Sequence, residues 1–212
     1  MLYIINKYIR IKMKSEEFIK FSDPLKLFSL WFDEAKEKDT YNYNACCLAT
    51  ADVRGVPSAR MVLVKSFDER GFIFFTNTNS RKAEEFERNN KVALCFYWKP
   101  LKRQVRIEGT IMDLPFKESD KYFKTRPRKS QIGAWASKQS NFMEGGYTTL
   151  LKKYKLYEEK FLGIDIPRPD FWCGKVILPE KIEFWIEKDN RLHERLLFTA
   201  QNEKWAKEYL YP

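Results

Sequence analysis

The chain has 212 residues, of which 44% are hydrophobic and 16% aromatic, so it can fill one sizeable core and wholesale disorder is unexpected. No stretch approaches the roughly 20 apolar residues of a membrane span. With a single histidine, the four cysteines do not suggest a His/Cys metal site. We therefore expect a reduced, cytoplasmic protein that holds no metal.

The net charge of +10 favours nucleic acid, a membrane surface or phosphorylated small molecules as partners. The cations lie in small groups that are far apart in the sequence, and there is no long basic tail. Such groups suit several phosphate contacts in one folded pocket, so we expect neither a nucleic-acid nor a membrane partner.

Residues 1–20 contain no continuous apolar segment, and we expect a disordered extension there, followed by one domain over residues 21–212. A helix is predicted from Pro24 to about Asp39. Asp23 can cap it, proline suits the first helical position, and apolar residues follow at helical spacing.

Strand-forming residues dominate from Ala45 onward, and the turns between them are short. The predicted strands of this half cover residues 45–53, 58–67, 72–76, 91–98 and 104–114. A polar helix over residues 81–88 interrupts them. Short turns imply antiparallel pairing, because parallel strands need long crossover connections.

The second half mixes both kinds of element. Helices are predicted over residues 115–125 and 147–159, and strands over residues 172–178, 182–188 and 191–199. No glycine-rich dinucleotide or Walker motif follows a strand, which disfavours a Rossmann domain. We predict a mainly β, α+β domain with six to eight antiparallel strands, in a barrel or sandwich rather than a doubly wound sheet.

Two basic motifs lie in the first half of the chain. Arg60 and Lys65 bracket an apolar strand segment, and alternation puts residues five apart on opposite faces of a strand. For this motif alone, an edge strand with solvated cations is the favoured interpretation. Arg81 and Lys82 open a helix behind Ser80, where free backbone N–H groups and the helix dipole favour a phosphate. Cations are unfavourable at a helix N-terminus unless an anion joins them, so we favour phosphate binding over simple capping.

A third motif combines Tyr122, Arg126 and Ser130. The first two are neighbours on one helix face, Pro127 is expected to end that helix, and Ser130 is expected in the following loop. These side chains can close around one phosphate. A solvated basic loop is the alternative, but the mixture of small residues, Trp135 and hydroxyls favours the phosphate site.

Polar side chains near the end of the chain form a fourth motif. On an extended strand, Arg191, His193 and Arg195 would share one face. The plainer interpretation is the polar outer face of a hairpin. Upstream, Gln104 can hydrogen-bond a planar heterocycle, although a surface strand with long polar side chains is the favoured interpretation of this residue alone.

Together and in this order, the motifs resemble the pyridoxine/pyridoxamine 5′-phosphate oxidase family over roughly residues 23–212. The resemblance is carried by residues 60–65, 76–77, 80–83, 103–105, 126–128, 130–135, 137–140, 171–172, 182–185 and 191–195. It implies a split β-barrel that binds FMN at a homodimer interface. The positions that match the family's FMN contacts are Arg60, Met61, Val62, Leu63, Val64, Lys65, Phe75, Thr76, Arg81, Lys82, Gln104, Gln139, Ser140, Trp185 and Arg195.

The resemblance also implies how the substrate is bound. Positions matching the substrate contacts are Lys65, Tyr122, Arg126, Ser130, Arg191 and His193, and the last two are the implied catalytic pair. The implied reaction oxidises pyridoxine or pyridoxamine 5′-phosphate to pyridoxal 5′-phosphate, with hydride passing to FMN and O2 giving H2O2. The amine also yields ammonia. Phe75 stands where the family often has tyrosine.

Two alternatives stay open. The first is a split-barrel FMN reductase or flavin-binding protein with another substrate, against which the joint presence of the implied substrate residues argues. The second is a basic nucleic-acid-binding domain, which would predict one contiguous basic face and a binding affinity that falls steeply with salt.

Overall fold

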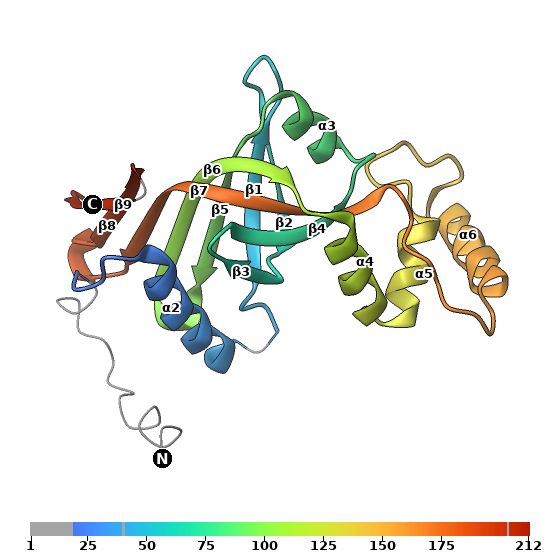
Figure 1. Ribbon diagram of the computed structural model, residues 1–212, viewed down its shortest axis with the longest axis horizontal. Coiled ribbons are helices and arrows are strands. Elements are labelled where there is room, and N and C mark those ends of the chain that lie inside the picture. Colours follow the sequence, from blue (N-terminus) through green and yellow to red (C-terminus); the bar gives the residue numbers. More distant parts are fainter. Residues whose placement is uncertain (1–18, 40, 203) are drawn as a thin grey trace. The chain divides into compact units, whose positions relative to one another are not determined.

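The computed structural model describes residues 19–39, 41–202 and 204–212 (Figure 1). Its strands are β1 (Ala45–Ala51), β2 (Pro57–Leu63), β3 (Ser66–Asp68), β4 (Gly71–Asn77), β5 (Lys91–Trp98), β6 (Arg103–Asp113), β7 (Trp172–Ile186), β8 (Glu194–Gln201) and β9 (Lys204–Leu210). Its α-helices are α2 (Pro24–Lys38), α3 (Arg81–Arg88), α4 (Phe116–Thr125), α5 (Arg128–Ala136) and α6 (Gly146–Lys160). The predicted α+β class is confirmed.

The strands form one hydrogen-bonded sheet in the order β2-β1-β5-β6-β7-β4-β3, and β8 pairs with β7 and β9. The pairs β3–β4, β4–β7, β7–β8 and β8–β9 are antiparallel, as the short turns predicted. Strand β7 pairs with β4 through Trp172–Ile177 and with β8 through Lys181–Ile186. Pro179 lies between these two ladders, so its missing N–H breaks neither of them.

Several predicted boundaries are wrong for local reasons. The strand predicted over residues 58–67 is two strands, β2 and β3, and the two strands predicted over residues 172–178 and 182–188 are the single strand β7. Helix α5 was expected to be a loop. Pro127 ends α4 as predicted, but it also occupies the N-cap position of α5, where a missing N–H costs nothing.

The start of β8 is also corrected. It begins at Glu194 instead of Arg191, because Asp189–Arg191 form a 3-10 turn in which Asn190 and Arg191 have positive φ of 55° and 62°. Strand β9 was not predicted at all.

The described residues fall into two compact units. One contains the chain up to Cys46 with Leu94–Glu108 and Pro179–Pro212, and the other contains Cys47–Ala93 and Gly109–Leu178. In the first unit, α2 buries Phe28 and Trp31, whose rings lie 5.3 Å from Phe96 and 5.0 Å from Phe184. Ring burial of this kind makes aromatic side chains the main packing element of this unit.

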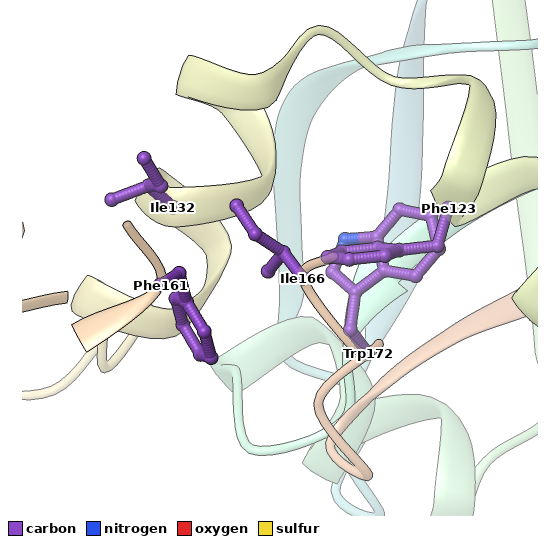
Figure 2. Packing of buried hydrophobic residues seen from close by; sticks show 5 residues of the cluster. All are labelled: Phe123, Ile132, Phe161, Ile166 and Trp172. Carbon is purple, nitrogen blue, oxygen red and sulfur yellow. The ribbon is translucent and has the colours of Figure 1, made fainter. Parts of the chain in front are cut away.

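The second unit has a core beneath α4, α5 and α6 that is shown in Figure 2. Its buried members are Phe123, Ile132, Phe161, Ile166 and Trp172. Phe123 and Trp172 meet edge to face, with ring centroids 5.0 Å apart. Because Phe123 belongs to α4 and Trp172 opens β7, this contact ties the helices to the sheet of the same unit.

The disordered extension expected over residues 1–20 lies almost entirely outside the described residues, and the single domain over residues 21–212 stays a prediction. Within the described ranges, no helix is long and apolar enough to cross a membrane. Nor does any group of three or more His, Cys, Asp and Glu side chains in these ranges have the arrangement of a metal site.

Candidate active site

The end of β4 and the start of α3 meet the loop that follows α5, all within the second unit. Asn77 Nδ2 donates to the Ser137 carbonyl at 3.4 Å, and Lys82 Nζ donates to Gln139 Oε1 at 2.9 Å and to Ser80 Oγ at 2.8 Å. Ser80 occupies the N-cap position of α3, but its hydroxyl donates to the Asn77 carbonyl instead of capping the helix. The structure thus brings together two of the residues predicted to bind FMN, Lys82 and Gln139.

Arg60 and Arg81 meet at one buried carboxylate, that of Glu85. Arg60 Nη2 lies 3.2 Å from Glu85 Oε2, and Arg81 Nε lies 2.8 Å from Glu85 Oε1. The hydroxyls of Thr50 and Ser58 donate to Oε2 and accept hydrogen bonds from Arg60. We call Arg60, Arg81, Lys82 and Glu85 the first cluster.

The charges of the first cluster shift the pKa of its members. Burial would raise the pKa of Glu85, but hydrogen bonds from Ser58, Thr50, Arg81 and Arg60 outweigh it and lower that pKa to about 2. Burial of the Lys82 amine, and then the charge of Arg60, lower its pKa to about 8. At pH 7 the cluster therefore carries three positive charges and one negative charge.

The first cluster fits a phosphate monoester. Its net charge of about two positive units matches the −1.5 to −2 of a phosphate group near pH 7. A phosphate beside Lys82 would also favour the charged amine and so raise its pKa again. The donor set of two arginines and a lysine is the kind that binds phosphate.

A second cluster in the same unit contains Lys65, Tyr122 and Arg126. Lys65 lies in the break between β2 and β3. Strand β2 therefore ends between Arg60 and Lys65, and the two cations belong to different clusters. The Lys65 side chain is solvent-accessible, yet lost hydration around its amine and the charge of Arg126 lower its pKa. Burial raises the pKa of Tyr122, and the charge of Arg126 opposes that shift.

Arg126 has an unusual environment within this second cluster. Its guanidinium lies 4.8 Å from the Trp172 ring centre and 5.5 Å from that of Phe123, and burial lowers its pKa. Its Nη1 atom is buried and has no hydrogen-bond partner in the described part of the chain. No ion pair joins Lys65 or Arg126 to a carboxylate of the described residues. A buried, unsatisfied donor of a cation is the arrangement expected where an anion binds.

Three near-parallel rings support the second cluster. Phe75 lies 4.1 Å from Tyr122 and 5.0 Å from Trp172, with interplanar angles of 12° and 5°. The Arg126 guanidinium packs on the same Trp172 ring. The stack therefore holds two predicted phosphate ligands in place, Tyr122 on α4 and Arg126 at the C-terminal end of that helix. Ser130, expected in a loop, lies instead on the exposed surface of the first turn of α5.

The first unit holds five of the predicted residues, which are Gln104, Trp185, Arg191, His193 and Arg195. His193 Nδ1 accepts a hydrogen bond from the Lys188 N–H at 3.2 Å, which puts the proton of a neutral imidazole on Nε2. The His193 ring lies 4.6 Å from that of Trp185. The shared strand face predicted for Arg191, His193 and Arg195 is wrong, because β8 begins only at Glu194.

Two further residues of this unit are held by Glu183. Arg195 Nε donates to Glu183 Oε1 at 2.8 Å, and Arg106 donates to Oε2 of the same carboxylate. Burial alone would raise the pKa of Glu183, but these hydrogen bonds outweigh burial and lower that pKa. Gln104 is half-buried on β6.

The remaining predicted positions differ in accessibility. Met61 and Leu63 are exposed on β2 and Val62 is half-buried, whereas Val64 is fully buried and Thr76 is 5% exposed. A ligand could meet the last two mainly through their backbone. Ser140 has φ of 69°, a conformation that is uncommon for serine and is often found at functional sites.

The sequence interpretation missed Glu85 and Trp172 as members of the site. The signal for Glu85 was available, because Arg81 and Glu85 are four apart and thus neighbours on a helix. No local sequence pattern predicts that Trp172 stacks on Phe75 and Arg126. These residues belong to β7, β4 and the end of α4, which only the fold brings together.

The comparisons with known proteins cover nearly the whole chain. Residues 33–156 match the family model described as pyridoxamine 5′-phosphate oxidase, and residues 172–212 match the pyridoxine 5′-phosphate oxidase C-terminal dimerisation region. A pyridoxine/pyridoxamine 5′-phosphate oxidase of Rubrobacter xylanophilus is 50% identical over 90% of this chain and 87% of that one. The enzyme of the same name from Brucella anthropi is 47% identical over 93% and 98%.

Solved structures agree with this relationship. PhzG from Burkholderia lata 383, in complex with tetrahydrophenazine-1-carboxylic acid, is 29% identical with a TM-score of 0.88 over 94% of this chain and 98% of that one. A pyridoxamine 5′-phosphate oxidase-related, FMN-binding protein from Nostoc punctiforme shares the fold, with a TM-score of 0.73 at 15% identity. The resemblance drawn from the motifs is confirmed, and the chain belongs to the pyridoxamine 5′-phosphate oxidase family, whose split-barrel architecture it shares.

Proposed function

We propose that the protein oxidises pyridoxine 5′-phosphate and pyridoxamine 5′-phosphate to pyridoxal 5′-phosphate with FMN as its cofactor. Curated relatives with this activity are 43–50% identical over nearly all of the chain. The observation that carries the proposal is the presence of two separate cation clusters in one unit, because the reaction needs a phosphorylated cofactor and a phosphorylated substrate.

The first cluster would bind the phosphate of FMN. Arg60, Arg81 and Lys82 supply the positive charge, and Gln139, already bonded to Lys82, lies at the same place. Gln104, Trp185 and Arg195 match the family's FMN contacts and would bind the cofactor as well, and Arg195 is oriented by Glu183. When bound, FMN would supply the redox chemistry of the oxidation, with O2 as the final electron acceptor that gives H2O2.

The second cluster would bind the phosphate of the substrate. Arg126 offers the buried, unsatisfied Nη1, and Lys65 adds a second cation whose charge an anion would stabilise. Tyr122, held flat against Phe75, can donate its hydroxyl to the same phosphate. Ser130 is accessible at the first turn of α5 and completes the proposed set.

Arg191 and His193 would hold the pyridine ring of the substrate. The backbone hydrogen bond to Nδ1 leaves the Nε2–H of His193 as the donor toward a ligand. Arg191 is exposed, and its guanidinium can orient an anionic or polar ring substituent and favour loss of a proton nearby. Positioning of this kind, rather than redox chemistry, is what the protein contributes to catalysis.

We further propose a homodimer with FMN at the subunit interface and a cytoplasmic location. Residues 172–212 match a family region named for dimerisation, and they contain Trp185, Arg191, His193 and Arg195. Residues that complete an FMN site would thus come from the segment that also forms the dimer. Gel filtration with light scattering tests this assembly.

One experiment tests the reaction. Pyridoxamine 5′-phosphate is added without oxygen to the purified, FMN-loaded protein, and the visible absorbance of the flavin is followed. Rapid bleaching that reverses on admission of air supports the proposed reaction. Pyridoxamine without its phosphate is the matched control and should bleach the flavin far more slowly. A flavin that neither phosphorylated vitamer bleaches would contradict the substrate assignment.

A second substrate class has one observation in its favour. The related PhzG structure holds a carboxylate-bearing ligand, tetrahydrophenazine-1-carboxylic acid. Lys65 and Arg126 could also attract a carboxylate, but a phosphate ester matches their joint charge better. The same bleaching experiment with an aromatic carboxylate as donor separates the two. Membership of an oxidase family argues against the nucleic-acid-binding alternative.

A further inference from the structure

Glu85 connects the two arginines of the first cluster. It lies on α3, and only 7% of its side chain is exposed. Its Oε1 accepts from Arg81 Nε at 2.8 Å, and its Oε2 accepts from Arg60 Nη2 at 3.2 Å. Because Arg60 comes from β2 and Arg81 from α3, this one carboxylate fixes the two guanidinium groups relative to each other.

The contact between Glu85 and Arg60 is reinforced by two hydroxyls. Thr50 and Ser58 each accept a hydrogen bond from Arg60 and donate one to Glu85 Oε2. Arg60 Nη1 also donates to the Leu48 carbonyl at 3.2 Å. A closed, buried network of charged hydrogen bonds holds its members in one geometry.

The Arg81 side chain depends on Glu85 in a different way. It is 63% exposed, and Glu85 is the partner that the structure gives its guanidinium within the described residues. A long, exposed arginine that loses its partner samples many rotamers, so a ligand would have to order it on binding. Glu85 removes that cost in advance.

We propose that Glu85 is a positioning residue for the cofactor phosphate, which holds Arg60 and Arg81 in the geometry that binds FMN. This inference rests on the proposed function, because it assumes that the first cluster binds the FMN phosphate. Glu85 itself does not touch the phosphate, since its oxygens are occupied by Arg60, Arg81, Thr50 and Ser58.

The sign of the effect separates positioning from simple electrostatics. A carboxylate near a phosphate repels it, so if charge alone mattered, Glu85→Gln would tighten FMN binding. If positioning dominates, Glu85→Gln weakens it. The amide replaces one acceptor oxygen by an NH2 group, so either Arg81 or the Arg60 network loses its acceptor.

The test measures flavin binding rather than turnover. The full-length chain is freed of flavin and titrated with FMN and with riboflavin, which lacks the phosphate, while flavin fluorescence is followed. We expect Glu85→Gln to raise the Kd for FMN about tenfold or more, as loss of a charged hydrogen bond does, and to leave the Kd for riboflavin within about twofold. A residue that only stabilises the fold would change both constants together.

Glu84→Gln is the matched control, because Glu84 is the exposed neighbour on the same helix and its substitution changes the net charge equally. It should bind both flavins like the wild type. An FMN Kd that stays unchanged or falls in Glu85→Gln would overturn the inference. A wild-type chain that binds neither flavin would instead overturn the proposed cofactor, and the inference with it.

A second variant covers the case in which Glu85→Gln does not fold. Glu85→Asp keeps the charge but shortens the side chain by one methylene, so it cannot bond Arg60 and Arg81 at once. It should weaken FMN binding and spare riboflavin binding. If Glu85→Asp kept the wild-type preference for FMN over riboflavin, the shared contact would be irrelevant to binding and the inference would be wrong.

Discussion

Replacement of Arg126 by methionine separates substrate binding from folding. The Arg126 guanidinium contacts the rings of Trp172 and Phe123, but its Nη1 is buried and lacks a hydrogen-bond partner among the described residues. Methionine keeps much of the apolar stem and removes both the charge and the unsatisfied donor. In the proposed site, it also removes the strongest ligand of the substrate phosphate.

Two features of Arg126 change the stability of the fold in opposite directions, its unsatisfied buried donor and its cation–π contacts. An unsatisfied buried donor costs about 1–3 kcal/mol, and the cation–π contacts stabilise by about 0.5–2 kcal/mol. These nearly cancel, so Arg126→Met should leave the free energy of unfolding of the substrate-free protein within about 1 kcal/mol of wild type. Loss of the charged phosphate contact should cost about 2–3 kcal/mol of binding, or a KM raised about 30- to 150-fold with kcat changed little.

The matched control is Arg128→Met, two residues further along. Arg128 donates to the carbonyls of Ile164 and Phe161 at the end of α6, so it has a structural role. We expect Arg128→Met to lower the unfolding free energy by about 1–2 kcal/mol and to leave KM unchanged. Urea unfolding and steady-state peroxide release with pyridoxamine 5′-phosphate measure both quantities.

The opposite pattern would contradict a ligand-binding role for Arg126. If Arg126→Met lost as much stability as Arg128→Met and kept the wild-type KM, Arg126 would be a packing residue. Its unsatisfied atom would then have no connection with a ligand.

Three further predictions address packing, acid stability and backbone strain. Gly174→Ala should lower the free energy of unfolding by about 1–3 kcal/mol in urea titrations, because its Cβ would lie 2.6 Å from Leu114 Cδ2 and 2.9 Å from Phe75 Cε1. Glu85, whose folded pKa of about 2 lies below its ordinary 4.5, stabilises the fold above pH 4.5 and loses that contribution as the pH falls toward 2. The stability difference between wild type and Glu85→Gln should thus shrink by about 1.4 kcal/mol from pH 7 to pH 3.5, whereas a constant difference would contradict the low pKa. Arg191→Gly should keep or raise the free energy of unfolding by up to about 1 kcal/mol in the same titrations, because φ of 62° suits glycine. Arg191→Ala is the control that removes the same side chain without this freedom, and turnover should fall in both variants. Equal loss of stability in the two variants would argue against strain at this position.

Most of the fold was predictable because its strands are apolar and its turns are short. Helix α3 and strand β5 have the predicted bounds, since a polar amphipathic helix and an alternating strand each give a strong local pattern. Strand β9 gave no such pattern. It is largely exposed, pairs with β8 alone among the described strands, and carries charges that protect an edge strand from further pairing.

The candidate site was predictable only in part. The motif comparison identified Arg60, Lys82 and Arg126, and the structure gives each a charged or unsatisfied environment that fits an anion. Side-chain alternation predicted that Arg60 and Lys65, five residues apart, point to opposite faces of a strand, but it could not show which cluster each belongs to. That separation follows from the break between β2 and β3, which an apolar run does not reveal.

The two clusters differ in a way that matches two kinds of ligand. The first contains its own counter-charge, so its arginines are ordered before any phosphate arrives, and preorganisation of this kind favours tight, long-lived binding. The second has no carboxylate among the described residues, and its cation is held by the faces of aromatic rings. An anion is needed there to satisfy the Nη1 atom of Arg126. That anion would contact one ordered guanidinium and one solvent-accessible lysine, and no closed hydrogen-bond network would surround it. A resident cofactor suits the first arrangement, and a substrate that must leave after each turnover suits the second.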